Sequence, residues 1–135
     1  MTLGPLMLDL EGLVLTPEER ALILNPSVGG IIFFARNFAS RSQLVELVAD
    51  IRATRAELLL CVDQEGGRVA RLPDEVATRY VGNMAIGATY PLYNTTFAER
   101  VNKGIAKSIG QLGFNVNFAP TVDVNVNADN PVINV

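Results

Sequence analysis

The chain has 135 residues, of which 49% are hydrophobic and 19% charged, and its formal net charge is −3 at pH 7. This length is enough for one domain with a core of its own, and the composition excludes an intrinsically disordered protein. The negative charge, without a basic cluster, argues against a nucleic-acid partner, and no apolar run approaches the ~18 residues of a membrane span.

The first half of the chain predicts two strands, each followed by a helix. Residues 6–10 and 29–34 are short apolar runs, which is typical of buried strands. Thr16 followed by Pro17 predicts the start of the first helix. Ser40 with Gln43 has the capping-box spacing and predicts the start of a second helix. In that second helix the apolar residues recur at helical spacing: Leu44, Leu47, Val48 and Ile51.

The second half repeats this pattern. Residues 58–62 predict a third, buried strand, in which Cys61 is expected to pack in the core. Residues 72–95 are less regular. Thr96 with Glu99 predicts a capping box at the start of a long helix, and Gly113 predicts its C-terminal cap. Residues 114–118 then predict a fourth strand.

Alternating strands and helices indicate an α/β fold with a parallel sheet and crossover helices. A (β/α)₈ barrel takes about 250 residues, so four units in 135 residues amount to about half a barrel. We therefore expect the N-terminal half, about four βα units, of a TIM-type barrel. Residues 1–135 would form one partial domain that ends after its fourth strand. Its unpaired edge strands predict self-association.

A dense polar turn follows the third strand in the sequence VDQEGGRVAR (residues 62–71). Ligands bind at the carboxyl ends of strands in parallel sheets, so Asp63 is a candidate binding residue, with Arg68 and Arg71 just beyond it. Gly66 and Gly67 predict a tight turn. They fit neither common phosphate-loop pattern, but a phosphosugar-binding α/β protein remains an alternative.

Two residue types limit the chemistry further. The chain contains no histidine, which excludes Ser-His, Cys-His and His-metal sites built from this sequence alone. The single cysteine excludes a disulfide framework. The N-terminal residues lack the pattern of a signal peptide, so the expected location is cytoplasmic.

Four segments resemble one enzyme family. Residues 62–71 and FAPTVDV (residues 118–124) resemble the third- and fourth-strand signatures of the bacterial β-N-acetylglucosaminidases of glycoside hydrolase family 3. GPLMLD (residues 4–9) and GGIIFF (residues 29–34) are similar to its first two strands. Residues 1–71 look most like the short cytoplasmic members, and residues 72–135 more like the longer chitin-degrading ones.

The resemblance implies a retaining hydrolase of terminal β-linked N-acetylglucosamine, acting on amino-sugar oligosaccharides such as chitin fragments or muropeptides, without cofactor or metal. The family's aspartate nucleophile and histidine acid/base have no counterpart here, so this chain would hold no catalytic residue and be inactive alone. Asp63 would grip sugar hydroxyls, and Arg71 would line the same pocket. Glu65, Arg68 and Asp123 would support the site. For Glu65 we expect contacts to Arg68 or to backbone amides.

Other interpretations carry less weight. Residues 123–134 begin like a calcium-binding loop, but Ala128 stands at the required glycine and Asn134 at the required glutamate. The sequence Asn94-Thr95-Thr96 matches a glycosylation sequon, yet it is better explained by helix capping. A non-catalytic half-barrel that assembles as a dimer is the remaining alternative.

Overall fold

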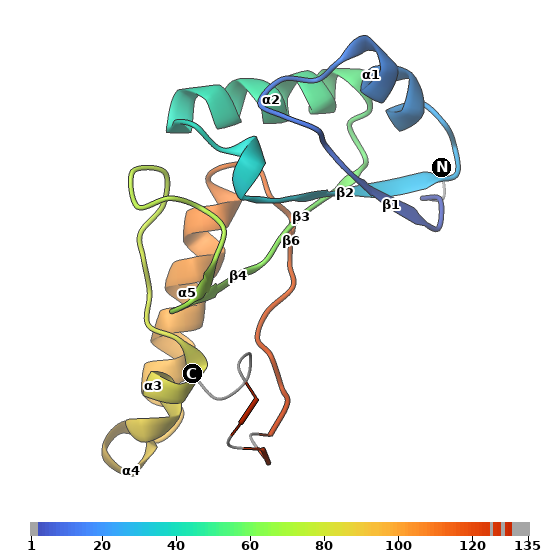
Figure 1. Cartoon of the computed structure of the whole chain (residues 1–135). Helices are drawn as coiled ribbons and strands as arrows, with labels where there is room; N and C mark the ends of the chain where they lie inside the picture. The colour runs from blue at the N-terminus through green and yellow to red at the C-terminus, as the bar shows by residue number, and fades with distance from the viewer. Residues whose placement is uncertain (1–2, 125, 128, 131–135) are drawn as a thin grey trace.

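The computed structural model describes residues 3–124, 126–127 and 129–130. In this part of the chain, four parallel strands form one sheet (Figure 1). They pair in the order β1 (Leu6–Asp9), β2 (Val28–Phe33), β3 (Leu59–Val62) and β6 (Val116–Asn117). The predicted parallel sheet and the four predicted strands are confirmed, with small changes at their ends.

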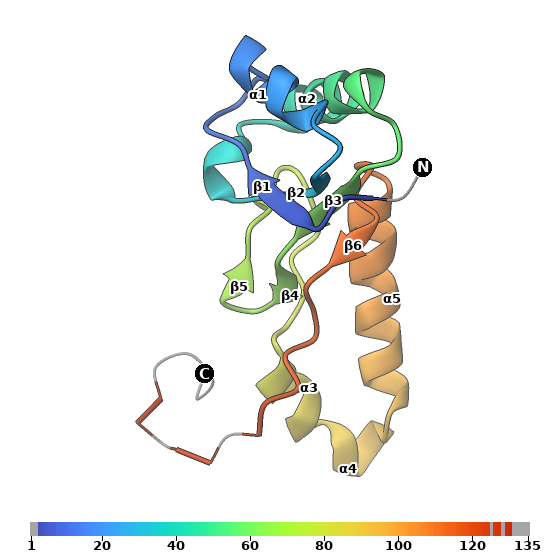
Figure 2. The ribbon, with the colours of Figure 1, turned by 90° about the vertical axis from the view of Figure 1, so that its right-hand side faces the viewer.

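Three helices make the crossovers between these strands: α1 (Pro17–Ile23), α2 (Arg41–Thr54) and α5 (Thr96–Gly110). Figure 2 shows α1 and α2 together above the sheet and α5 at its side. The other elements are short: the 3₁₀ helix η1 (Ala35–Asn37), the helices α3 (Asn83–Ala88) and α4 (Tyr90–Tyr93), and the antiparallel hairpin of β4 (Gln64–Gly66) and β5 (Val69–Ala70).

The helix caps partly follow the predictions. Thr16 accepts a hydrogen bond from the Glu19 amide, and the Glu19 carboxylate accepts one from the Thr16 amide, which completes a capping box. At α2, the Ser40 hydroxyl accepts from the Gln43 amide as predicted, but the Gln43 side chain accepts from the Ala39 amide instead of the Ser40 amide.

The capping box predicted at Thr96 is wrong. Thr96 is the first residue of α5, and its amide and hydroxyl both donate to the side-chain oxygen of Asn94. Glu99 pairs with Lys103 one turn later. Asn94 thus bonds the first amide of the helix, while Thr95 at the N-cap makes no side-chain capping bond, so the capping interpretation of the sequon is met only in part. At the other end Gly113 has a φ of +92°, and the Phe114 amide donates to the Ile109 carbonyl, as in a glycine C-terminal cap.

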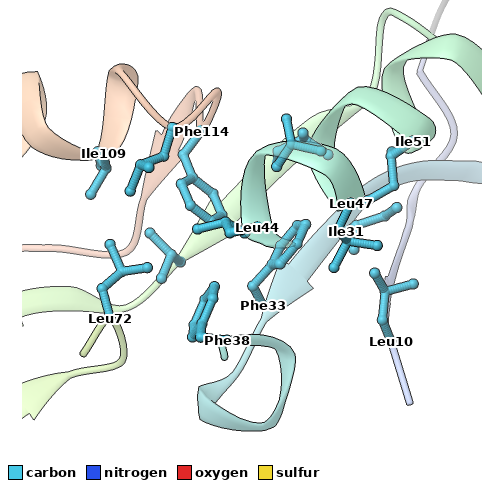
Figure 3. Close-up of a cluster of buried hydrophobic side chains, with 14 of the residues drawn as sticks. Leu10, Ile31, Phe33, Phe38, Leu44, Leu47, Ile51, Leu72, Ile109 and Phe114 are labelled. Atoms are coloured by element: carbon cyan, nitrogen blue, oxygen red, sulfur yellow. The ribbon is translucent and has the colours of Figure 1, made fainter. Parts of the chain in front are cut away.

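The core lies between the sheet and its helices. Phe33 is fully buried on β2, with its ring centroid 5.0 Å from that of Phe114 and 6.2 Å from that of Phe38 (Figure 3). Apolar residues of α2 pack around the three rings. These are the residues predicted from helical spacing, Leu44, Leu47, Val48 and Ile51. The three rings therefore connect β2 with the segment that leads into β6.

Substituting Phe33→Ala is expected to lower the free energy of unfolding by about 3–5 kcal/mol, because it removes a buried ring and leaves a cavity between β2 and α2. Leu92→Ala is the control, since Leu92 is 79% exposed, and it should change that free energy by no more than about 0.5 kcal/mol. Chemical denaturation of the full-length protein, followed by circular dichroism, measures the free energy of unfolding of both variants. Equal effects of the two substitutions would contradict this description of the core.

Candidate functional site

The candidate site begins where β3 ends. Asp63 lies between β3 and β4, at the carboxyl edge of the parallel sheet. The predicted tight turn is confirmed, because Gly66 and Gly67 have φ values of +90° and +57°. The Gly67 amide donates to the Tyr80 carbonyl at 2.8 Å, and a Cβ added to Gly66 would lie 2.5 Å from the Val81 carbonyl oxygen. The turn is packed against the chain at residues 80–82, which leaves the Gly67 amide unable to bind phosphate.

The hairpin folds back so that Arg71 meets Asp63. A terminal nitrogen of the Arg71 guanidinium lies 3.3 Å from the Asp63 carboxylate, and both side chains are partly exposed. The Nε atom of Arg71 is buried and has no hydrogen-bond partner, the one such side-chain nitrogen or oxygen in the described residues. A buried donor without a partner costs free energy, and such exceptions in folded proteins call for an explanation.

Gln64, next to Asp63, is buried, with 3% of its surface exposed. Its side-chain oxygen accepts a hydrogen bond from the Leu72 amide at 3.1 Å. Its own backbone is held by the side chain of Asn117, which accepts from the Gln64 amide at 3.0 Å and donates to the Gln64 carbonyl at 2.9 Å. Sequence reasoning missed Gln64 and Asn117. For Gln64, the available signal was an uncharged polar residue two positions after the buried strand β3.

Glu65 holds the segment that follows β6. One of its carboxylate oxygens accepts hydrogen bonds from the Thr121 amide at 3.0 Å and the Thr121 hydroxyl at 2.6 Å. The side-chain amide of Asn83 at the start of α3 donates to the same oxygen at 3.4 Å. The predicted contact with a backbone amide is confirmed. Glu65 therefore connects the hairpin to two segments far away in the sequence.

The remaining two candidates are exposed. Arg68 lies in the turn between β4 and β5, and Asp123 lies in the loop after β6. That loop has no strand at residues 121–124. Glu65, through its hydrogen bonds to Thr121, holds the start of that loop. The structure thus brings Asp63 and Arg71 together, whereas the roles of Arg68 and Asp123 stay predictions.

A separate hollow of about 490 Å³ lies beside the carboxyl end of β1. The ion pair of Asp9 with Arg36 is part of its lining. None of the five candidate residues of the polar turn and the loop after β6 lines it. The lining is formed by Asp9, Leu10, Glu11, Thr16, Glu18, Glu19, Leu22 and Arg36.

Cys61 packs in the core as predicted, and burial raises the pKa of its thiol.

Within the described ranges, no three His, Cys, Asp or Glu residues lie close enough together to hold a metal ion. The calcium-loop pattern of residues 123–134 falls partly outside those ranges. No described helix is both long and apolar enough to cross a membrane.

Residues 7–135 match the sequence model of a family described as "Glycosyl hydrolase family 3 N terminal domain". Beta-hexosaminidase A of Pseudoalteromonas piscicida is 46% identical over 127 residues, which are 90% of this chain and 21% of that protein. A beta-hexosaminidase of Nitrosomonas eutropha is 41% identical over 129 residues, which are 93% of this chain and 37% of that protein.

Solved structures are similar as well. NagZ from Neisseria gonorrhoeae, in complex with N-trifluoroacetyl-D-glucosamine, superposes with a TM-score of 0.83 at 36% identity, over 90% of this chain and 37% of that chain. A glycoside hydrolase family 3 beta-N-acetylglucosaminidase from Paenibacillus sp. superposes with a TM-score of 0.84 at 40% identity, over 94% of this chain and 24% of that chain. These likenesses confirm the predicted α/β fold of the TIM-barrel type. The chain spans less than two fifths of each of these relatives.

Proposed function

The chain belongs to glycosyl hydrolase family 3, and on that premise we propose that it forms part of a β-N-acetylhexosaminidase. The intact enzyme would remove terminal, non-reducing β-linked N-acetylglucosamine from chitin fragments or muropeptides with retention of configuration. Residues 1–135 would supply the first four strands of its barrel and part of its sugar-binding site. The names of the similar proteins, beta-hexosaminidase and beta-N-acetylglucosaminidase, support this proposal.

The contact between Asp63 and Arg71 carries the proposal. A carboxylate accepts charge-assisted hydrogen bonds from adjacent hydroxyl groups, and a guanidinium donates to sugar oxygens. Both side chains are partly exposed at the edge of the sheet where ligands of parallel α/β folds bind. Glu65 would act on the sugar indirectly, by holding Thr121 and its loop.

The catalytic groups would come from residues other than these. A retaining glycosidase uses two carboxyl groups or their equivalents about 5 Å apart, and its nucleophile forms a covalent glycosyl-enzyme that water then hydrolyses. Asp63 is paired with Arg71, and Glu65 accepts hydrogen bonds from Thr121. We assign neither carboxylate the role of nucleophile, because these contacts suit Asp63 to binding and Glu65 to support of its loop. An aspartate and a histidine outside residues 1–135 would perform these two steps, as the family resemblance implies.

The stereochemical course of hydrolysis tests the proposal. The full-length product of the gene that encodes this sequence should release nitrophenol from 4-nitrophenyl N-acetyl-β-D-glucosaminide. Proton NMR should show β-N-acetylglucosamine as the first sugar product, followed by slow mutarotation. Parallel assays with chitobiose and with a muropeptide distinguish the two substrate classes. Absence of hydrolysis, or the α anomer as first product, would overturn the proposal.

Metal removal should leave this activity unchanged, because two carboxyl groups or their equivalents perform the chemistry. Incubation of the full-length product with EDTA, followed by the nitrophenol assay, measures the effect. The same full-length product incubated in buffer without EDTA is the control. Loss of activity that calcium restores would contradict this expectation and favour the calcium-loop interpretation of residues 123–134.

A further inference from the structure

Two side-chain amides hold the main chain on both sides of the Asp63–Arg71 contact. They belong to Asn117, on the edge strand β6, and to Gln64, on the hairpin strand β4. Neither amide bonds to the carboxylate or to the guanidinium of that contact. Both bond to backbone groups of residues adjacent to the pair, and this arrangement is the basis of the inference.

Asn117 fixes the backbone around Asp63. Before Asp63, the Val62 carbonyl accepts a hydrogen bond from the Phe118 amide at 3.0 Å. After Asp63, the side chain of Asn117 bonds both the amide and the carbonyl of Gln64, at 3.0 and 2.9 Å. One side chain therefore continues the pairing of β3 with β6 past the end of the regular strand. Without it, Asp63 would be held by β6 on one side only.

Gln64 fixes the backbone around Arg71 in the same way. Before Arg71, Ala70 pairs with Gln64 across the hairpin. After Arg71, the Leu72 amide donates to the side-chain oxygen of Gln64 at 3.1 Å, in a buried position. The hydrogen bonds that link Asn117 to Gln64, and Gln64 to Leu72, thus set the position of both Asp63 and Arg71.

We propose that Asn117 and Gln64 are positioning residues for sugar binding, which set the relative placement of Asp63 and Arg71; the inference rests on the proposed function. Charge-assisted hydrogen bonds depend on placement, and a shift of about 1 Å in a positioned group can change a rate about 100-fold. A binding site needs its side chains held by supporting hydrogen bonds. Removing the Asn117 amide releases Gln64, and through it both members of the pair.

The chain offers a matched control in Asn115. Its side-chain oxygen accepts from the Leu60 amide at 2.7 Å, and its amide group lies 3.4 Å from the Leu58 carbonyl oxygen. Asn115 therefore makes the same kind of contact between the same two chain segments, but at the start of β3, away from Asp63. Asn115→Ala and Asn117→Ala remove the same chemical groups. Only the second removes a contact next to the pair.

The test measures KM and kcat for 4-nitrophenyl N-acetyl-β-D-glucosaminide, and the thermal unfolding midpoint, in the full-length product. Both substitutions should lower the midpoint to a similar extent. Asn117→Ala should raise KM about tenfold or more with a smaller change in kcat, whereas Asn115→Ala should leave KM within about twofold. On an Asp63→Ala background, Asn117→Ala should change KM by no more than about twofold, because the residue acts through the pair. Equal KM values for the two single variants would overturn the inference.

The outcomes also separate the inference from the proposed function. If Asp63→Ala lowers activity strongly while Asn117→Ala behaves like Asn115→Ala, the function stands and the inference fails. If Asp63→Ala has no effect, Asp63 is removed from the site and the inference fails, while the hydrolase function stands. If the wild-type protein hydrolyses no N-acetylglucosaminide, the proposed function fails and the inference fails with it. If Asn117→Ala does not fold, Asn117→Asp, which keeps the acceptor for the Gln64 amide and loses the donor, is judged by the same KM criterion.

Discussion

Asp63→Ala is expected to lower kcat/KM for a nitrophenyl N-acetylglucosaminide about 30–1000-fold in the full-length product. In the proposed function Asp63 binds the terminal sugar, so the substitution would remove charge-assisted hydrogen bonds, and the loss of such a contact costs about 2–4 kcal/mol in the transition state. It also leaves the Arg71 guanidinium without its partner at 3.3 Å, so a second binding group is displaced. Arg71→Ala should lower kcat/KM less than Asp63→Ala does.

Asp74 provides the control for this substitution. Its carboxylate pairs with Arg79 at 3.0 Å, and both side chains are more than half exposed. Asp74→Ala therefore removes an aspartate–arginine pair of similar geometry at the surface, where such pairs contribute little to stability. It should leave kcat/KM unchanged. Steady-state kinetics on the purified proteins decides the matter, and an Asp63→Ala enzyme within about threefold of wild type would remove Asp63 from the site.

The strands and the position of Asp63 could be predicted from the sequence, because both depend on local patterns. Residues 58–62 form an apolar run that ends in a polar turn, and this pattern places Asp63 at the strand end wherever the helices lie. The hairpin of β4 and β5 was missed because its residues are polar, glycine-rich and few. The fourth strand is shorter than predicted, since side-chain amides replace part of its backbone pairing.

The supporting contacts of the site could not be predicted in the same way. Asn117 bonds to a residue 53 positions away, and Thr121 bonds to one 56 positions away. Such contacts depend on which strands are neighbours in the sheet, which residue spacing alone does not show. The Asp63–Arg71 contact spans 8 positions, and the Gly66-Gly67 turn that brings it about was recognisable in the sequence. The end of the third strand pointed to Asp63, Arg68 and Arg71 as candidates and the family resemblance gave them roles, but their partners could be found only in the fold.

The polypeptide of residues 1–135, produced by itself, should show no glycosidase turnover. Retaining hydrolysis needs a nucleophile and an acid/base group about 5 Å apart, on opposite sides of the glycosidic bond. Asp63 and Glu65 are carboxylates of the candidate site, and Arg71 and Thr121 contact them. The chain has no histidine that could take the role of the acid/base. An assay for released N-acetylglucosamine, with the full-length product as positive control, measures the expected loss.

The same polypeptide should associate with itself. In the described residues β1 and β6 are the edges of the sheet, and both have unpaired backbone groups. Apolar side chains are exposed at these edges, with Leu6 53% and Phe118 46% exposed. Two copies could pair their edges about a two-fold axis, or larger aggregates could form. Leu6→Glu with Phe118→Glu should reduce association in light scattering, because charge on an edge opposes pairing, whereas Leu92→Glu on α4 should not. A monomer with measurable turnover would contradict both expectations.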